Sequence, residues 1–232
     1  MEFYLATVII AILFIIFAYW KGKIDSSALV LSGVVGFVVL FSLGGKWPYL
    51  WLILVFFFIG NLVTKYRYSR KESNGVAEGI RTWKNVFGNG GSATIFALLY
   101  GITGNEIILL GLLGAMATAA GDTFATEVGE AHEREPRLIT TFKKVKVGTS
   151  GAISRYGLVA ALVGAGIISL IAAIMEQNSS VLLIGILAGF IGCNVDSLVG
   201  ATIEKMLNKH VTNFLGTLSG GMAAVILSYL IL

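Results

Sequence analysis

Long apolar runs recur along almost the whole chain, and polar residues gather in the short segments between them. A helix needs roughly 20 mostly apolar residues to cross a membrane. Seven runs come close to that length, at residues 3–20, 28–43, 47–64, 107–125, 152–174, 181–200 and 212–232. An eighth, 92–103, is long enough only when 86–91 is counted with it. The pattern predicts an all-α, polytopic membrane bundle of about eight transmembrane helices.

Basic residues fall almost entirely on one side of such a bundle. Lys and Arg accumulate in cytoplasmic loops, so their positions set the orientation. With eight spans and both termini outside, all but one of the 17 Lys and Arg residues lie inside, the exception being Lys46. Omitting the run at 92–103 would invert every later loop, and the asymmetry therefore supports a short span there. We expect a multi-pass protein of the cell membrane with its chemistry at the cytoplasmic side.

The composition excludes several classes of protein. Hydrophobic residues make up 56% of the 232 positions, and charged residues make up 13%, about half the usual share. The 29 glycines fit closely packed membrane helices. The one cysteine cannot form an intramolecular disulfide, and two histidines are too few for a histidine-based metal site. An ordinary cytosolic enzyme, a nucleic-acid-binding module and a disordered protein are excluded. We expect a single integral membrane domain over residues 1–232.

The second inner loop, residues 65–91, carries two candidate features. Val76, Ile80, Trp83 and Phe87 recur at helical spacing, which predicts a short amphipathic helix on the membrane surface. The simplest role for such a helix is attachment to anionic lipid, and the alternative is that Arg81 and Lys84 also face a phosphate pocket.

Gly88, Asn89, Gly90 and Gly91 follow and lead into the short span. Glycine lets the backbone approach a ligand, and a helix start offers free N–H groups to an anion. A simple turn into the helix is the alternative interpretation.

Two aspartates occupy equivalent places in their spans. Asp122 lies at the inner end of one apolar run, and Asp196 lies at the inner end of another that runs in the same direction. A carboxylate at that depth is costly and is usually functional. Carboxylate oxygens suit Mg²⁺, and Glu127 is a weaker candidate for a third ligand. The alternative is that each carboxylate is neutralised by a Lys or Arg from another helix.

The third inner loop combines lysines with a glycine turn. Lys143, Lys144 and Lys146 precede a turn that opens the next span, Gly148, Thr149, Ser150 and Gly151. Backbone N–H groups, hydroxyls and ammonium groups together can hold an anion. The positive-inside signal alone would also explain the lysines.

These groups together favour phosphoryl transfer. That reaction needs Mg²⁺ held by carboxylates, cations on the phosphates and N–H groups around them. An acceptor that is itself a phosphate is already anionic and needs little base catalysis, which suits a chain with two histidines. A site in the membrane further implies a lipid substrate.

Several motifs match one known membrane family. They are Arg81 with Asn89-Gly90-Gly91, Gly121-Asp122 with Glu127, Gly148-Thr149-Ser150-Gly151 with Ser154, and Asp196 with Gly200. Over roughly residues 25–232 the chain resembles the family that includes transmembrane protein 19 and phytyl-phosphate kinase. That family is distantly similar to CTP-dependent polyprenol kinases and phosphatidate cytidylyltransferases. The resemblance implies Mg²⁺-dependent transfer of a phosphate from CTP, or another nucleoside triphosphate, to a prenyl monophosphate such as phytyl or geranylgeranyl phosphate.

Two other functions remain as alternatives. In a transporter or channel for an anionic solute, Asp122 and Asp196 would carry a coupling cation. Such a path needs polar groups across the outer half of the membrane, where the sequence has few. A lipid cytidylyltransferase would join the nucleotide to the lipid and release diphosphate. The expected partners are an isoprenoid monophosphate, a nucleoside triphosphate and membrane lipid, with no nucleic acid; an oligomer is compatible with all three functions.

Overall fold

A computed structural model of the protein describes residues 2–232, apart from the side chains of Glu2, Glu204 and Lys205. Eight helices of 16 or more residues make up most of this part: α1 (Glu2–Trp20), α2 (Ser26–Leu43), α3 (Leu50–Lys65), α5 (Trp83–Thr103), α6 (Glu106–His132), α7 (Arg155–Glu176), α8 (Ser179–Leu207) and α9 (Lys209–Ile231). The shorter elements are a 3-10 turn, η1 (Gly44–Tyr49), the helix α4 (Tyr68–Ser73) and an antiparallel pair of strands, β1 (Arg137–Leu138) and β2 (Ala152–Ile153).

Polar side chains cap the N-termini of several of the long helices. The Asp25 carboxylate accepts a hydrogen bond from the backbone N–H of Ala28 at 2.8 Å, at the start of α2. Thr82 and Asn85 form a reciprocal capping box at the start of α5. At the starts of α6 and α9, the side-chain oxygens of Asn105 and Asn208 accept hydrogen bonds from backbone N–H groups of the first turn. Because these side chains satisfy backbone N–H groups that have no partner within the helix, they fix where each helix begins.

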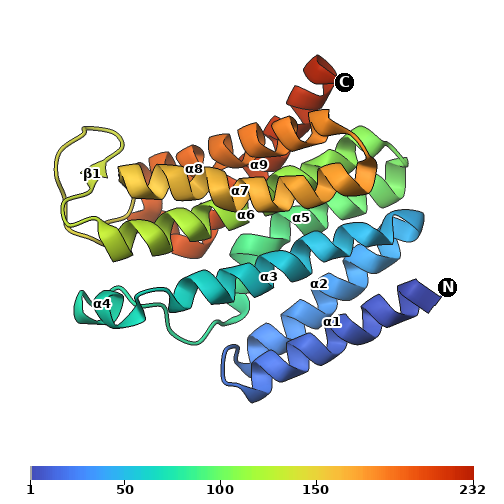
Figure 1. Ribbon diagram of the computed structural model, residues 1–232, viewed down its shortest axis with the longest axis horizontal. Helices are drawn as coiled ribbons and strands as arrows, with labels where there is room; N and C mark the ends of the chain where they lie inside the picture. Colours follow the sequence, from blue (N-terminus) through green and yellow to red (C-terminus); the bar gives the residue numbers. More distant parts are fainter. Residues whose placement is uncertain (1) are drawn as a thin grey trace.

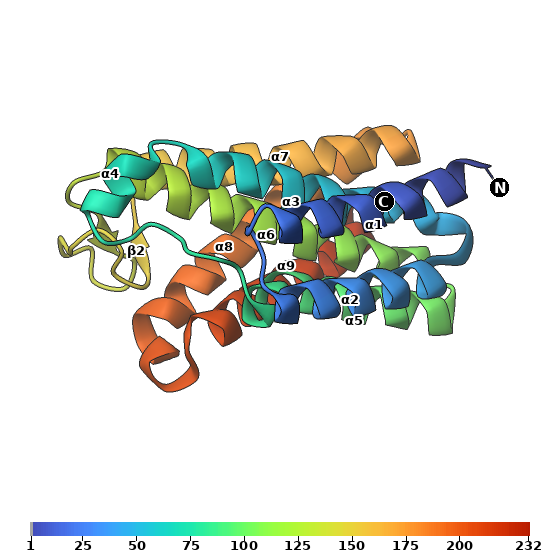
Figure 2. The same cartoon turned by 90° about the horizontal axis from the view of Figure 1, so that it is seen from below.

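Successive long helices run back and forth along the bundle (Figure 1). The two termini lie at one end, and α4 and the β1–β2 loop lie at the other. Figure 2 shows the junction of α8 and α9 at the same end as the β1–β2 loop. This end carries the basic loops, so the structure places most of the charge together.

Six segments of the described chain are long and apolar enough to cross a membrane. One of them, Ser26–Lys65, contains both α2 and α3, and α5 is not among the six. The predicted polytopic helical bundle is confirmed. The number of helices that cross the membrane, and the side that each end faces, stay predictions.

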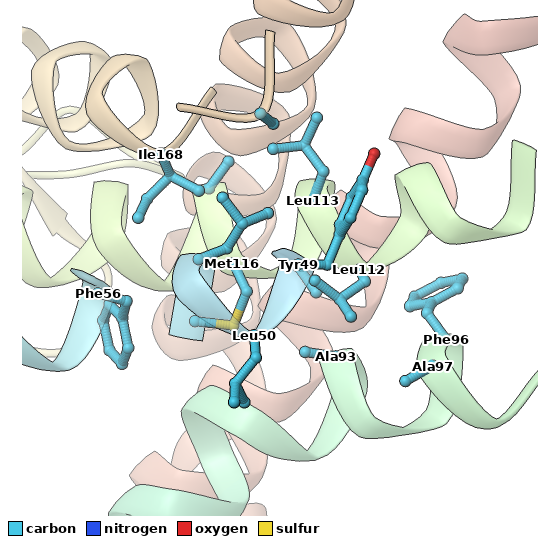
Figure 3. Close-up of a cluster of buried hydrophobic side chains, with 14 of the residues drawn as sticks. Tyr49, Leu50, Phe56, Ala93, Phe96, Ala97, Leu112, Leu113, Met116 and Ile168 are labelled. Atoms are coloured by element: carbon cyan, nitrogen blue, oxygen red, sulfur yellow. The ribbon is translucent and has the colours of Figure 1, made fainter. Parts of the chain in front are cut away.

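The core of the bundle is α6. In an apolar stretch of 18 residues within it, 72% of the residues are buried, and α3, α5, α7, α8 and α9 all pack against it. Leu112, Leu113 and Met116 are fully buried among side chains from the neighbouring helices (Figure 3). Glycines allow this close packing: a Cβ on Gly114 would lie 2.4 Å from the carbonyl oxygen of Gly220. The rigid packing of α6 fixes the polar groups that follow along the same helix.

The segment before α5 corrects one prediction. Residues 76–82 are not helical, so the expected amphipathic surface helix is absent from this described segment. Instead the backbone N–H of Arg81 donates to the carbonyl of Lys23 at 3.1 Å, and the N–H of Asp25 donates to the carbonyl of Arg81 at 3.0 Å. The capping box at Thr82 then starts the helix at Trp83. Residues 76–82 therefore do not form the helix that their periodicity predicts, and Arg81 instead pairs with the segment before α2.

Residues 88–91 correct a second prediction, because they lie inside α5 and do not form a turn at its start. A Cβ on Gly88 would lie 2.9 Å from the carbonyl oxygen of His210, and one on Gly91 would lie 3.2 Å from the ring of Phe214. These two glycines let α5 approach α9. Their N–H groups belong to the helix interior and do not form the expected phosphate cradle.

Candidate functional site

A polar cavity of about 150 Å³ lies at the end of the bundle that carries the basic loops. Residues of α6, α7, α8 and α9 line it, together with the loop that connects α6 to α7. Its charged lining consists of Asp122 and Glu130 from α6, Asp196 from α8 and Lys209 from α9. The cavity therefore brings together groups that are up to 87 positions apart in the sequence.

The two aspartates come together as the sequence predicted, since both line this cavity. Close packing positions them. A Cβ on Gly121, next to Asp122, would lie 2.8 Å from the Cys193 sulfur, and a Cβ on Gly216 would lie 2.8 Å from the Cβ of Asp196. Cys193 is itself buried, and its thiol donates to the carbonyl of Thr118 at 3.6 Å. Small residues on α6, α8 and α9 thus hold the carboxylates at one cavity.

Lys209 supplies the cation of the cavity lining. It is the first residue of α9, and its ammonium group interacts electrostatically with the carboxylates of Glu78, which is outside the lining, and of Asp122, Glu130 and Asp196, which belong to it. Asn194 and Asn213 add amide groups to the lining. Three carboxylates face one ammonium group, so the lining carries an excess of negative charge.

The glycine loop lies at the cavity but not at a helix start. Gly148, Thr149, Ser150 and Gly151 all line the cavity, whereas α7 begins only at Arg155. The φ angles of Gly148 and Gly151 are +82° and +73°, a region that favours glycine. A Cβ on Gly151 would lie 2.5 Å from the backbone nitrogen of Ala201, so the loop is packed onto α8. The predicted helix N-terminus is therefore wrong for this turn, although the turn does lie at the same cavity as the two aspartates.

Ser154 is the residue that does cap α7. Its hydroxyl oxygen accepts a hydrogen bond from the backbone N–H of Gly157 at 3.0 Å. Ser154 also lines the cavity, and a Cβ on Gly129 of α6 would lie 3.2 Å from its hydroxyl oxygen. Ser154 thus fixes the start of α7 against α6, beside the glycine loop.

The three loop lysines do not line the cavity. Lys143, Lys144 and Lys146 are all exposed. The Lys144 ammonium group donates to the Glu135 carboxylate at 2.5 Å, and this hydrogen bond holds the pKa of Glu135 below its ordinary value. Strand pairing directs this part of the loop away from the cavity, since Lys144 lies opposite Arg137 in a β-bridge.

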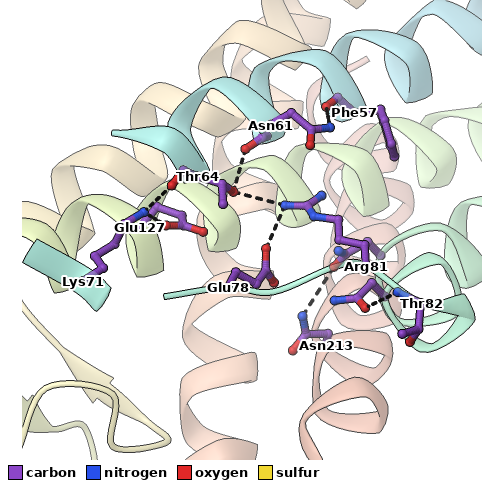
Figure 4. A network of polar contacts seen from close by, with 12 residues as sticks. Phe57, Asn61, Thr64, Lys71, Glu78, Arg81, Thr82, Glu127 and Asn213 are labelled. Carbon is purple, nitrogen blue, oxygen red and sulfur yellow. Dashed lines mark hydrogen bonds and ion pairs between the residues drawn. The ribbon is translucent and has the colours of Figure 1, made fainter. Parts of the chain in front are cut away.

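Glu127 also lies away from the cavity, because α6 continues unbroken to His132. Five residues along a helix turn a side chain by about 140° from Asp122. Glu127 instead forms a buried ion pair with Lys71 of α4, whose ammonium group also donates to the carbonyl of Thr64 at 2.6 Å (Figure 4). The described residues contain no group of three or more His, Cys, Asp or Glu placed to hold a metal. Glu127 is thus not positioned as the third ligand.

Arg81 belongs to the same polar network as Lys71. Its Nη2 donates to the Glu78 carboxylate at 3.0 Å and to the Thr64 hydroxyl at 3.2 Å (Figure 4). Arg81, Asn89 and Gly90 line a second, mostly apolar cavity, and Gly91 lines neither cavity. The expected phosphate contacts of these four residues are therefore not seen at the polar cavity.

Comparison with known proteins identifies the family. Residues 9–224 match the family described as "Integral membrane protein DUF92". The chain belongs to the DUF92 family. An uncharacterized membrane protein of Methanocaldococcus jannaschii is 34% identical over 206 residues, which cover 88% of this chain and 85% of the relative. No solved structure matches.

Two plant proteins are further relatives of this DUF92 chain. "Protein PGR" of Arabidopsis thaliana is 34% identical over 67% of the chain, and "Protein VTE6, chloroplastic" of the same plant is 30% identical over 78% of it. Each match spans 59% of the plant protein. The resemblance to the transmembrane protein 19 and phytyl-phosphate kinase family is confirmed. The chain is an integral membrane protein with several spans, and the membrane that holds it stays a prediction.

Three residues that line the polar cavity of this DUF92 chain are not predicted from its sequence: Lys209, Asn194 and Asn213. Lys209 contributes to the basic asymmetry, but every inner lysine does so, and the pattern therefore does not distinguish it. Asn213 carried a usable signal, because an amide one turn into an apolar span is costly without a partner.

Proposed function

We propose that this protein is a membrane-embedded prenyl-phosphate kinase. It transfers the terminal phosphate of a nucleoside triphosphate, with CTP favoured, to an isoprenoid monophosphate such as phytyl or geranylgeranyl phosphate. The observation that carries this proposal is a single cavity lined by Asp122, Asp196 and Lys209 at one end of a membrane bundle. Membership of the same family as phytyl-phosphate kinase supports the class of substrate.

The chemistry of the lining fits Mg²⁺. Mg²⁺ prefers oxygen ligands and usually binds through one or two carboxylates together with substrate phosphates. Asp122 and Asp196 supply two carboxylates, and Asn194 and Asn213 supply amide oxygens. When bound there, the ion would offset the negative charge of the phosphates.

The transfer step needs no general base. An anionic oxygen of the lipid monophosphate attacks the terminal phosphorus of the nucleotide. The bond from that phosphorus to the bridging oxygen breaks, and the nucleoside diphosphate leaves. Lys209 lines the cavity and would donate to phosphate oxygens, while Thr149 and the glycine loop face the same space.

The charge at Lys209 should matter more than the charges of the loop lysines. We expect Lys209→Met to lower kcat/KM for the nucleotide at least about tenfold, because it removes the cation that faces the phosphates. Lys143→Met and Lys146→Met are matched controls on exposed positions and should stay within about threefold of wild type. Steady-state kinetics of the three variants measure this. An equal loss in a loop variant would show that the loop, and not Lys209, contacts the phosphates.

Product identification tests the proposal itself. The purified protein is incubated with Mg²⁺, geranylgeranyl or phytyl monophosphate and each nucleoside triphosphate in turn. A kinase yields the lipid diphosphate and a nucleoside diphosphate. A cytidylyltransferase yields a nucleotide-linked lipid and free diphosphate, and a transporter leaves both substrates unchanged. Either of these two results would overturn the proposed function.

A further inference from the structure

A second cavity, of about 90 Å³ and mostly apolar, is lined in part by α5. It lies across α5 from α9, and α9 lines the polar cavity. Helices α1, α2, α3 and α5 enclose it, and Met116 of α6 closes one side. Most of its lining is aliphatic or aromatic, including Phe14, Ile53 and Phe56. These apolar side chains suit a hydrocarbon.

The polar side chains of this apolar cavity are concentrated toward one end. Arg81, Asn85 and Asn89 come from the start of α5, and Ser32 comes from the second turn of α2. From Phe57 to Leu50 the cavity follows α3 for seven residues, about 10 Å along the helix axis. The cavity therefore has a polar end at the basic side of the bundle and an apolar end deeper in it.

The polar end adjoins the candidate active site. The Asn213 side-chain amide donates to the side-chain oxygen of Asn89 at 3.4 Å, between α9 and α5. Asn213 lines the polar cavity, and Asn89 lines the apolar cavity. A ligand with an anionic head and an apolar tail would fit this arrangement, with its head in the polar cavity, its tail in the apolar cavity and the amide pair between them.

We propose that the apolar cavity holds the isoprenoid chain of the lipid monophosphate whose phosphate reacts in the polar cavity. This inference rests on the proposed function for the reaction at the phosphate, whereas binding of the chain is measured separately. The cavity is smaller than the 150 Å³ space that encloses a benzene ring in an engineered protein, so it takes a short segment of chain. Helix α1 is its outer wall, and only 17% of that span is buried, so α1 can shift to admit more of the chain from the bilayer.

Gly36 offers a clean way to fill this cavity. It lines the apolar cavity from α2, and a Cβ added there would meet nothing within 4 Å. It lies one turn beyond Ser32, toward the apolar end. Gly33 is a matched control, because it lies on the same helix with equally open space, is exposed and does not line the cavity.

The test compares Gly36→Leu with Gly33→Leu on a long and a short substrate. For Gly36→Leu we expect the ratio of kcat/KM for geranylgeranyl over dimethylallyl monophosphate to fall at least about tenfold, about 1.4 kcal/mol. The five-carbon chain ends before the filled region, so its kcat/KM should change little. Gly33→Leu should keep the wild-type ratio. An unchanged ratio in Gly36→Leu would overturn the assignment of the cavity.

A binding measurement separates this inference from the proposed function. A geranylgeranyl monophosphate that carries a photoreactive diazirine at mid-chain is irradiated with the protein in nanodiscs. We expect label on the α2 and α3 peptides that contain Gly36 and Ile53, and loss of that label in Gly36→Leu. Such labelling without phosphate transfer would support the chain site and overturn the kinase. Phosphate transfer with label only on other helices would support the kinase and overturn the chain site.

Discussion

Asp122→Asn and Asp196→Asn are each expected to lower kcat at least about 100-fold while leaving the protein folded. Asparagine has nearly the same shape as aspartate, and each change removes a negative charge from a cavity with an excess of it. What is lost is a ligand for the ion that offsets charge on the transferring phosphoryl group. High nucleotide concentration should therefore not restore turnover. Steady-state kinetics, with thermal unfolding to confirm the fold, measure both effects.

Glu135→Gln is the control for these two variants. It removes a carboxylate at the same end of the bundle, but Glu135 is exposed and pairs with Lys144 outside the polar cavity. Its turnover should match wild type. If Asp122→Asn or Asp196→Asn keeps more than about a tenth of wild-type turnover, a loss of under ~1.4 kcal/mol, that aspartate is not a metal ligand. It would then act as a structural partner of Lys209.

Lys71→Ala is expected to lower the free energy of unfolding by about 3–5 kcal/mol, because it leaves the Glu127 carboxylate buried without its cation. The side chain of Lys71 is fully buried, and that of Glu127 is 6% exposed. The pair also fastens the short helix α4 to α6. Denaturant or thermal unfolding in detergent measures the loss.

Replacing both members of this pair is the informative comparison. Apolar residues of similar size often substitute for a buried ion pair at little cost. Lys71→Met combined with Glu127→Leu should therefore recover most of the stability lost in Lys71→Ala, and it should retain turnover. A stable double variant without Mg²⁺-dependent turnover would contradict the structural role of Glu127 and restore it as a metal ligand.

The helices were predictable because hydrophobic runs of membrane length leave few alternatives. The error at residues 88–91 has a physical origin. Glycines serve a phosphate turn and a close helix contact equally well, and only the position of Phe214 and His210 on α9 shows which one applies. Gly216 and Gly220 of α9 also serve close helix contacts, since a Cβ on each would lie against α8 and α6 respectively.

The members of the candidate site that could be predicted are the carboxylates, because a carboxylate inside an apolar span is costly. Asp122 and Asp196 are costly at their depth, and the cavity contains both. Charged residues in loops carry no such signal, so Lys209 could not be told from Lys143 or Lys146 by sequence. The role of Glu127 could not be predicted without its partner, Lys71, which lies 56 positions away in the sequence. The fold of α4 brings Lys71 to Glu127.

The most direct test of the central claim follows the position of the label in the nucleotide. Purified protein is given geranylgeranyl monophosphate, Mg²⁺ and CTP labelled with ³²P on either the α- or the γ-phosphate, with Asp122→Asn in parallel. The proposed kinase predicts lipid-bound label from the γ-phosphate only, and almost none from the Asp122→Asn variant. Label from the α-phosphate in the lipid would contradict phosphoryl transfer in the cavity of Asp122, Asp196 and Lys209. So would the absence of labelled lipid both with CTP and when each other γ-labelled nucleoside triphosphate replaces it.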